Sequence, residues 1–419
     1  MLNALLQKLT GKSKPKTRSE QTIVHENQYV APNYNPLPVV LHRGEGLYLW
    51  DQEGKKYLDM MSAYSAVSCG HAHPRIVARL RDQAGQLAVC SRAYHSDLLA
   101  PFAEKLAKLT GLEMMLPMNT GAEAVETAVK AARLWGYSVK GIPENAAEII
   151  VAEGNFHGRT TTVISFSTEA DYRKNFGPFT PGFRAVPFGD LKAIEASITP
   201  NTAAVLLEPI QGEAGIKTPP AGFLRDLRAL CDKHNVLLIL DEVQSGLGRT
   251  GKMFCYQHEN ILPDLLVLGK ALGGGLLPVS AVVGKKAVIS LFKPGSHGST
   301  FGGNPLAAAV GLESLRVLEE EGMVENSARL GEYMLNQLRG INSPLIREVR
   351  GKGLWIGVDF DPERVAARKI CEKMMDRGIL SKDTHETVVR FAPPLTITQG
   401  EVDWCLEQFR EVLREFEAK

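Results

Sequence analysis

Residues 236–249, with the sequence VLLILDEVQSGLGR, form the stretch that decides how this chain folds. Five apolar residues run directly into Asp241 and Glu242, a pattern that predicts a buried strand with charged side chains at its end. Residues 265–268 form a second apolar run, which leads in the same way to Lys270 within LLVLGKALGGG. If the two strands are parallel neighbours, their charges meet at the carboxyl ends of the strands, where α/β sheets usually bind ligands.

Strand-like and helical patterns alternate along the middle of the chain. The strand patterns lie at residues 148–152, 203–207, 236–240, 265–268 and 281–283, with helical patterns such as 122–135 and 223–234 between them. This alternation predicts an α/β fold with a mainly parallel sheet covered by helices on both faces. The expected divisions are a basic arm at 1–20, an N-terminal segment at 21–70, a large domain at 71–305 and a small α+β domain at 306–419, which begins with a linking helix at 306–321.

The composition excludes several classes of protein. The 419 residues include 48 Lys and Arg against 47 Asp and Glu, and a net charge of +1 gives no general attraction for nucleic acid or anionic membrane. No apolar run approaches the roughly 18 residues of a spanning helix, so we expect a soluble protein. Six cysteines without a CxxC pair favour free thiols in a reducing compartment: Cys69, Cys90, Cys231, Cys255, Cys371 and Cys405.

The first residues of the chain are basic. No acid precedes Glu20, whereas five basic residues do: Lys8, Lys12, Lys14, Lys16 and Arg18. One interpretation is a disordered or loosely docked arm on a cytoplasmic protein, and the other is a peptide that targets the mitochondrial matrix. The segment is rich in lysine, whereas targeting peptides of this kind are rich in arginine, which favours the arm. The sequence leaves both interpretations open.

The residues around Asp241 and Lys270 fit pyridoxal 5'-phosphate. An isolated acid and lysine would more often be a plain ion pair, but this cofactor needs an amine for its aldehyde and an acid at its ring nitrogen. It also needs a phosphate site, and residues 119–124, NTGAEA, open a helical pattern whose first backbone N–H groups face an anion. Phe156 in GNFHGR follows a predicted strand and could cover the ring.

Two other motifs suggest different ligands. Residues 246–251 satisfy GxGxxG after a strand, and with Lys252 they come close to a phosphate-binding loop for nucleotides. However, Met253 stands where Ser or Thr should bind magnesium, and no long helical pattern follows Gly251, so we disfavour a nucleotide. Residues 69–74, CGHAHP, could hold a metal through Cys69, His71 and His73, but Pro74 favours a turn, and we expect no metal.

Ten segments in order resemble the class III aminotransferases of the fold type I pyridoxal phosphate enzymes. The resemblance runs from Asn33 to about Pro394 and is greatest to members that act on ornithine. It implies a seven-stranded, mainly parallel sheet in the large domain, pyridoxal 5'-phosphate as cofactor and a homodimer with shared active sites. The segments are NYNPLPVVLHRGEG, AYSAVSCGHAHP, LPMNTGAEAVETAVKAAR, GNFHGRT, EPIQGEAG, LDEVQSGLGRTG, LGKALGGG, HGSTFGGNP, VRGKGLW and VVRFAPPL.

The same resemblance implies roles for the residues that surround the cofactor. Lys270 would bind it covalently and then move a proton, and Asp241 would pair with the ring nitrogen. Gln244 would hydrogen-bond the ring hydroxyl oxygen, between Val243 and Phe156 on the two ring faces. The phosphate would be bound by Thr120, Gly121 and Ala122, and by Ser299 and Thr300, with Thr300 reaching across from the other subunit. Without the resemblance, the 299–300 segment would equally fit a solvent-facing turn.

Arginines are the candidates for binding the substrate carboxylates, since a guanidinium can hold a carboxylate through two parallel hydrogen bonds. Arg159 and Arg390 are these candidates. By the resemblance, Glu213 pairs with Arg390 while the amino donor reacts and releases it for 2-oxoglutarate, although the two could also form an ordinary salt bridge. Tyr34 and Tyr64 would contact the α-amino and carboxylate end of ornithine.

The reaction implied is transfer of the δ-amino group of L-ornithine to 2-oxoglutarate. The products are glutamate and glutamate 5-semialdehyde, which cyclises to pyrroline-5-carboxylate. His157 in GNFHGR is the form seen in acetylornithine enzymes, so acetylornithine or another ω-amino acid is the alternative donor. A cofactor-binding protein without catalytic activity is a further alternative, which the presence of both Lys270 and Asp241 disfavours.

Overall fold

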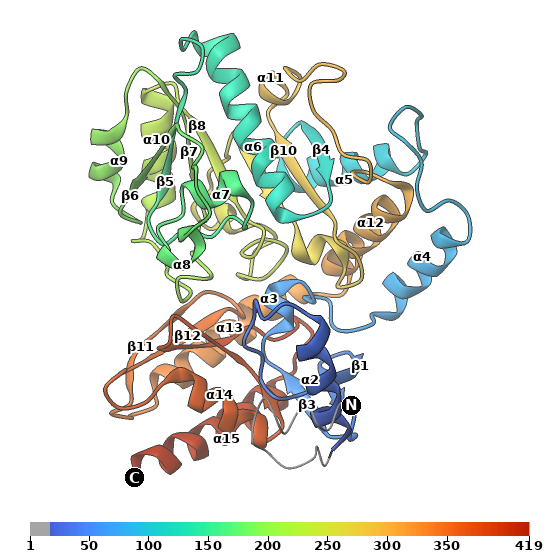
Figure 1. Cartoon of the computed structure of the whole chain (residues 1–419), viewed down its shortest axis with the longest axis vertical. Coiled ribbons are helices and arrows are strands. Elements are labelled where there is room, and N and C mark those ends of the chain that lie inside the picture. Colours follow the sequence, from blue (N-terminus) through green and yellow to red (C-terminus); the bar gives the residue numbers. More distant parts are fainter. Residues whose placement is uncertain (1–16, 419) are drawn as a thin grey trace.

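The computed structural model describes residues 17–418, which form a large upper domain and a smaller lower domain (Figure 1). The large domain contains a seven-stranded sheet in the order β4-β10-β9-β8-β7-β5-β6. All neighbouring strands are parallel except β10, which is antiparallel to both β9 and β4. The strands are β4 (Met114–Met118), β5 (Glu148–Ala152), β6 (Phe183–Val186), β7 (Thr202–Leu207), β8 (Leu237–Asp241), β9 (Leu265–Leu268) and β10 (Ser280–Gly284).

Helices cover both faces of this sheet. Every residue of β7, β8, β9 and β10 is buried, which explains why these strands appear in the sequence as continuous apolar runs. One apolar cluster joins the sheet to α6, and a second joins its other face to α5, α10 and α12. The helices are α4 (Pro74–Ala84), α5 (Leu99–Thr110), α6 (Gly121–Trp135), α7 (Thr161–Ser165), α8 (Ala170–Arg173), α9 (Leu191–Ser197), α10 (Phe223–Lys233), α11 (Lys286–Ile289) and α12 (Pro305–Glu320).

The sequence patterns located these elements closely. Each predicted strand and helix named above agrees with the structure to within one residue at either end. The linking helix α12 begins at Pro305, after Asn304 as its N-cap, because the Asn304 side chain accepts a hydrogen bond from the backbone N–H of Ala307. The predicted mainly parallel, doubly covered sheet is therefore confirmed, whereas the exact domain boundaries stay predictions.

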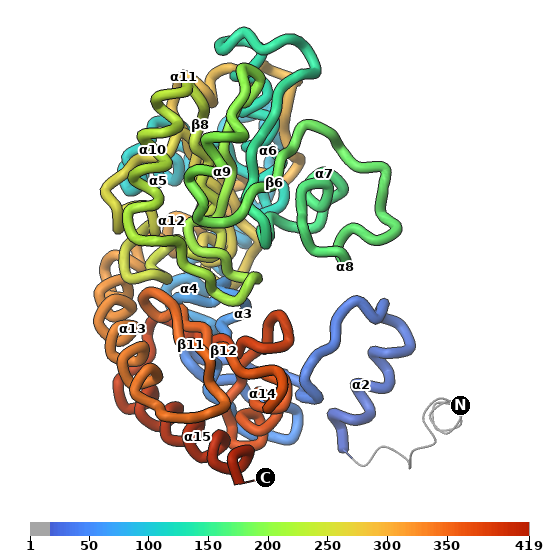
Figure 2. The backbone as a smooth tube through the Cα atoms, turned by 90° about the vertical axis from the view of Figure 1, so that its left-hand side faces the viewer, coloured from blue at the N-terminus to red at the C-terminus, as the bar shows by residue number. Residues whose placement is uncertain are grey.

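The small domain combines the two ends of the chain (Figure 2). Strand β13 (Ile379–Leu380) pairs in parallel with β3 (Lys56–Asp59), so the N-terminal and C-terminal segments share a sheet. That sheet also contains β1 (Leu41–Glu45) and β2 (Tyr48–Asp51), and the second has the order β11-β12-β15-β14. The remaining elements are α2 (Arg18–Tyr29), α3 (Ser62–Ser65), α13 (Met323–Arg339), β11 (Ile346–Gly351), β12 (Ile356–Phe360), α14 (Ala367–Asp376), β14 (Lys382–Thr384), β15 (Val388–Phe391) and α15 (Gln399–Glu417).

The expected basic arm lies almost entirely outside the described residues. Helix α2 begins at Arg18, and Thr17 and Glu20 form a capping box in which each side chain accepts the backbone N–H of the other. The last residues assigned to the arm therefore belong to a helix.

Arg249 connects parts of the chain that are far apart in sequence. Its buried guanidinium donates hydrogen bonds to the carbonyls of Leu354 and Pro393, at 2.8 and 2.7 Å, and to the hydroxyls of Ser62 and Ser68, at 3.0 and 3.1 Å. Burial lowers the pKa of Arg249 to about 9. These contacts join the large domain to both the N-terminal segment and the small domain.

No described group of three His, Cys, Asp or Glu side chains is placed to bind a metal, and no described helix is both long and apolar enough to cross a bilayer. His71 Nε2 lies 2.7 Å from Asp59 Oδ2, and His73 Nε2 lies 3.1 Å from Glu321 Oε2. The histidines of the CGHAHP turn thus have separate acidic partners. All six cysteines are free thiols.

Candidate active site

Asp241 and Lys270 lie at the ends of neighbouring parallel strands, as predicted. Asp241 is the last residue of β8, Lys270 follows β9 after one glycine, and the two strands are hydrogen-bonded to each other. Both side chains line one cavity of about 200 Å³. The cavity is lined by Gly121, Ala122, Phe156, His157, Gly158, Glu208, Ile210, Asp241, Val243, Gln244, Ser245 and Lys270.

The backbone and amine of Lys270 are both unusual. The residue has a φ of 46°, in the left-handed region that costs a non-glycine residue energy. Burial lowers the pKa of its amine, and this effect outweighs the negative charges of Glu213 and Asp241, which raise the pKa. Its amine has no hydrogen-bond partner among the residues that the structure describes. A lowered pKa increases the neutral fraction of the amine, which is the nucleophilic form.

Asp241 is held in place by His157. Nδ1 of His157 lies 2.7 Å from Asp241 Oδ2, and the backbone N–H of Val243 donates to Oδ1 at 3.0 Å. Burial disfavours a charged imidazole, but the hydrogen bond and the charge of Asp241 outweigh it and raise the pKa of His157. The sequence did not decide what His157 contacts; the structure places it against Asp241, away from the wider cavity described below.

Glu208 is a cavity residue that the sequence analysis missed. It directly follows β7, the strand next to β8, so the strand-end argument used for Asp241 would also have found it. Its carboxylate accepts hydrogen bonds from the backbone N–H groups of Phe156, at 3.0 Å, and Gly212, at 3.3 Å. Burial is the largest influence on this carboxyl and raises the pKa of Glu208 to about 7.

This raised pKa gives a testable dependence of stability on pH. Between about pH 4.5 and 7 the folded cofactor-free protein retains a proton on Glu208 that the unfolded chain has lost, so its stability falls as pH rises. Glu208→Gln should remove up to about 3 kcal/mol of this fall, measured by urea denaturation at pH 5 and pH 8. Glu153→Gln is the matched control, because Glu153 follows β5 in the same way but is exposed. Equal pH dependence in wild type and Glu208→Gln would contradict the assignment.

The N-terminus of α6 faces the cavity, at the place where the phosphate is expected. Thr120 and Glu123 form a capping box: Thr120 Oγ1 accepts the N–H of Glu123 at 3.2 Å, and Glu123 Oε2 accepts the N–H of Thr120 at 2.8 Å. Thr120 does not line the cavity, and its backbone N–H is already paired with Glu123, so its contact with the phosphate stays a prediction. Gly121 and Ala122 do line the cavity. Gly158 packs closely against Ala122, since a Cβ at position 158 would clash with the Cβ of Ala122 at 2.8 Å.

Ser299 and Thr300 lie near this helix terminus without lining the cavity. Ser299 Oγ accepts a hydrogen bond from Asn119 Nδ2 at 2.8 Å, which attaches the turn to the residue before the N-cap. Thr300 is exposed. A contact from Thr300 to the site of another subunit therefore stays a prediction.

Val243, Phe156 and Gln244 all line the cavity, as expected. Phe156 packs edge-to-face against Tyr172 with ring centroids 5.9 Å apart. Gln244 Nε2 donates to Glu213 Oε1 at 3.0 Å, and its buried Oε1 has no partner among the described residues. Gln244 thus connects the cofactor-sized cavity to Glu213.

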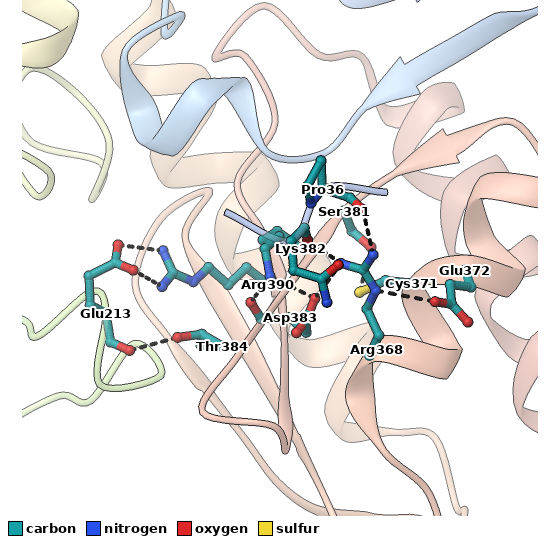
Figure 3. A network of polar contacts seen from close by, with 11 residues as sticks. Pro36, Glu213, Arg368, Cys371, Glu372, Ser381, Lys382, Asp383, Thr384 and Arg390 are labelled. Atoms are coloured by element: carbon teal, nitrogen blue, oxygen red, sulfur yellow. Dashed lines mark hydrogen bonds and ion pairs between the residues drawn. The ribbon is translucent and has the colours of Figure 1, made fainter. Parts of the chain in front are cut away.

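A second, wider cavity of about 610 Å³ contains most of the predicted substrate residues. Tyr34, Tyr64, Arg159 and Glu213 line it, together with residues 380–385 of the small domain. Arg390 is buried behind Glu213 and donates to both of its carboxylate oxygens, at 2.8 and 2.7 Å (Figure 3). Burial opposes the charge of Glu213, but Arg390 outweighs it and lowers the pKa of the Glu213 carboxyl to about 2. The predicted pair is therefore present and charged on both sides.

Arg159 differs from Arg390 because it is exposed and has no acidic partner within the described chain. Three aromatic rings surround its guanidinium instead. Its Cζ lies 4.4 Å from the ring centroid of Tyr172 and 5.9 Å from those of Tyr34 and Phe156. A guanidinium oriented by aromatic rings and free of a carboxylate partner is suited to bind an anionic group of a ligand.

Comparisons with known proteins agree with this geometry. The family Aminotransferase class-III matches residues 29–413. The ornithine aminotransferase of Brevibacillus brevis is 54% identical over 397 residues, which cover 95% of this chain and 99% of that protein. The solved ornithine aminotransferase of Toxoplasma gondii ME49 superimposes with a TM-score of 0.94 at 42% identity over 99% of this chain and 98% of its own. The acetylornithine aminotransferase of Elizabethkingia anophelis has a TM-score of 0.87 at 45% identity over 95% and 100%.

Proposed function

The chain belongs to the class III aminotransferase family, and we propose that it transfers the δ-amino group of L-ornithine to 2-oxoglutarate with pyridoxal 5'-phosphate as cofactor. The products would be glutamate and glutamate 5-semialdehyde, which cyclises to pyrroline-5-carboxylate. The observation that carries the choice of substrate is the closed Glu213–Arg390 pair beside Arg159, which has no carboxylate partner among residues 17–418.

The residues of the smaller cavity fit this cofactor. The amine of Lys270 matches its aldehyde, the carboxylate of Asp241 its ring nitrogen, and the N-terminus of α6 its phosphate. The orphaned Oε1 of Gln244 gives the cavity a polar atom whose partner a ligand could supply. When bound, the cofactor supplies an electron sink for the carbon that loses a proton.

The chain's own residues would orient and move protons around that carbon. The Nζ of Lys270 takes the proton from the substrate carbon that bears the transferred amine and holds it for return. His157 fixes the Asp241 carboxylate at the strand end, and Val243 and Phe156 exclude water from the space between them. Glu208 holds the backbone of Phe156 in place.

Glu213 explains how a substrate with amines at both ends reacts at its terminal amine. While Glu213 neutralises Arg390, the α-carboxylate of ornithine is left to bind Arg159, which places the δ-amine toward Lys270. In the second half of the reaction, Glu213 leaves Arg390. The two carboxylates of 2-oxoglutarate then bind Arg390 and Arg159, and Tyr34 and Tyr64 complete the wall around the far end of the donor.

Acetylornithine is the alternative donor, favoured by the 45% identity to the Elizabethkingia anophelis enzyme. His157, the sequence feature in its favour, contacts Asp241 and does not line the wide cavity. Tyr34 and Tyr64 do line it, which favours a donor whose α-amino group is free.

Steady-state turnover with three donors tests the proposal. With 2-oxoglutarate as acceptor, kcat/KM for ornithine should exceed that for N-acetylornithine and for 4-aminobutyrate at least about tenfold, since a charged hydrogen bond lost on either substitute is worth roughly 1.5–3 kcal/mol. Trapping pyrroline-5-carboxylate identifies which amine was transferred. A clear preference for the acetylated donor would overturn the assignment.

We also propose a homodimer that acts in the cytoplasm. Phe301 directly follows the expected intersubunit contact at Thr300 and is 54% exposed. Tyr94, in a stretch of the sequence that contains other exposed apolar residues, is 73% exposed. Large exposed apolar side chains of this kind favour a protein interface. The similarity to bacterial proteins such as that of Brevibacillus brevis favours the cytoplasm over a mitochondrial matrix.

A further inference from the structure

A polar network in the small domain connects two segments on the wall of the wide cavity (Figure 3). One segment is the loop 33–37, which carries Tyr34, and the other is the hairpin 211–217, which carries Glu213. Strand β14 lies between them and lines the same cavity through all three of its residues. The two elements proposed to select the substrate are thus both connected to β14, the loop through Arg368 and Asp383 and the hairpin through Thr384.

Arg368 of α14 holds the Tyr34 loop. It donates from Nη1 to the carbonyl of Asn35 at 3.1 Å and from Nη2 to the carbonyl of Pro36 at 2.8 Å. The guanidinium is itself fixed by Glu372, at 3.2 Å, and by Asp383 of β14, at 3.7 Å. The loop forms neither helix nor strand, so these two hydrogen bonds are its main polar attachment to the small domain.

Thr384 holds the hairpin on the other side of β14. Its buried Oγ1 donates to the backbone carbonyl of Glu213 at 2.7 Å. Gln211 and Lys217 close the hairpin through two backbone hydrogen bonds of 3.0 Å, and Arg350 Nε donates to the carbonyl of Gly215 at 2.9 Å. The main chain around Glu213 is therefore fixed from within the hairpin and from the small domain.

We propose that Arg368 and Thr384 are positioning residues for substrate selection, an inference that rests on the proposed function. Arg368 keeps Tyr34 over the far end of the amino donor. Thr384 keeps the backbone of Glu213 in place, so that Arg390 is uncovered by rotation of the Glu213 side chain alone. The two residues act on different halves of the reaction, and each therefore has its own kinetic signature.

Removing the Arg368 hydrogen bonds should weaken binding of the donor. Arg368→Met is expected to raise KM for ornithine about tenfold with kcat nearly unchanged, and to alter KM for 2-oxoglutarate less than about threefold. Arg368→Lys keeps a positive charge near Glu372 and Asp383 but cannot reproduce the two-pronged contact, so it should behave like Arg368→Met. Arg364→Met is the matched control, because Arg364 is exposed and its ion pair within the described chain is with Asp361 alone.

Removing the Thr384 hydroxyl should loosen the cover over Arg390. In single turnovers followed by the absorbance of the bound cofactor, Thr384→Val should shift the ratio of ornithine to L-glutamate reactivity about tenfold toward glutamate. Thr384→Ser restores the hydroxyl and should restore the ratio. A merely structural role would change both donors together.

The outcomes separate this inference from the proposed function. Equal effects of Arg368→Met on ornithine and 2-oxoglutarate, or a wild-type donor ratio in Thr384→Val, would overturn the positioning roles. Failure of the proposed function would appear in the wild type alone, as a preference for N-acetylornithine. In that case the same difference between donor and acceptor is measured with N-acetylornithine, since Arg368 holds the Tyr34 loop and Thr384 holds the Glu213 hairpin through backbone carbonyls.

Discussion

Lys270→Ala is expected to lower transamination by at least about 10⁴-fold, because one side chain supplies both the covalent attachment for the cofactor and the proton transfer at the substrate carbon. The variant should still fold, since within the described residues the amine has no hydrogen-bond partner to lose. Replacing a left-handed lysine with alanine also leaves the backbone conformation accessible at similar energy. The measurements are kcat with ornithine and the visible absorbance of lysine-bound pyridoxal phosphate, which should disappear.

A matched variant and a chemical rescue make this result specific. Lys285→Ala should retain activity, because Lys285 pairs with Asp264 outside the cavity. Added small primary amines should partly restore the proton transfer in Lys270→Ala while leaving Lys285→Ala unaffected. Retention of more than about a tenth of wild-type activity in Lys270→Ala would refute the proposed role.

Asp241→Asn should produce the second largest loss, about a thousandfold in kcat. An acid about 4 Å from a protonated ring nitrogen, at an effective dielectric near 20, contributes roughly 4 kcal/mol, and each 1.4 kcal/mol is a factor of about ten in rate. The amide has nearly the same shape, so the loss would arise from charge. The substitution also removes the anionic partner of His157, which lies 2.7 Å away.

Two readouts test the role of Asp241. Besides kcat, the dissociation constant of the cofactor should rise, and the pH titration of its visible absorbance should shift because the ring nitrogen is no longer held protonated. Asp232→Asn, at an exposed position of α10, is the control. A kcat within tenfold of wild type would show that the ring nitrogen needs no acid here.

The sequence predicted the fold well where runs of apolar residues were unbroken. Strands such as β8 and β9 are buried on both faces, and their runs of Leu, Ile and Val lead to a charged residue, directly in β8 and after one glycine in β9. Both the strands and the meeting of Asp241 with Lys270 could therefore be inferred. The same rule applied to β7 would have identified Glu208. The T-x-x-E pattern of Thr120 and Glu123 also signalled a capping box, which would have shown that the Thr120 N–H is already paired.

Contacts between distant segments could not be inferred from local pattern. His157 and Asp241 are 84 residues apart, and Glu213 and Arg390 are 177 residues apart. The pairing of Glu213 with Arg390 follows only from the resemblance to a family, and the sequence leaves the partner of His157 open. Neither Arg368 nor Thr384 differs in the sequence from an ordinary surface arginine or strand threonine, because their partners are backbone carbonyls of other segments.

The buried guanidinium of Arg249 constrains how small molecules reach the two cavities. Separating the domains would break the hydrogen bonds that the buried Arg249 cation donates to Leu354, Pro393, Ser62 and Ser68. Wide opening and closing about the domain boundary is therefore strongly disfavoured. Donor, acceptor and product can instead enter the wide cavity at its open side, where Tyr34 and Arg159 line it and are exposed to solvent.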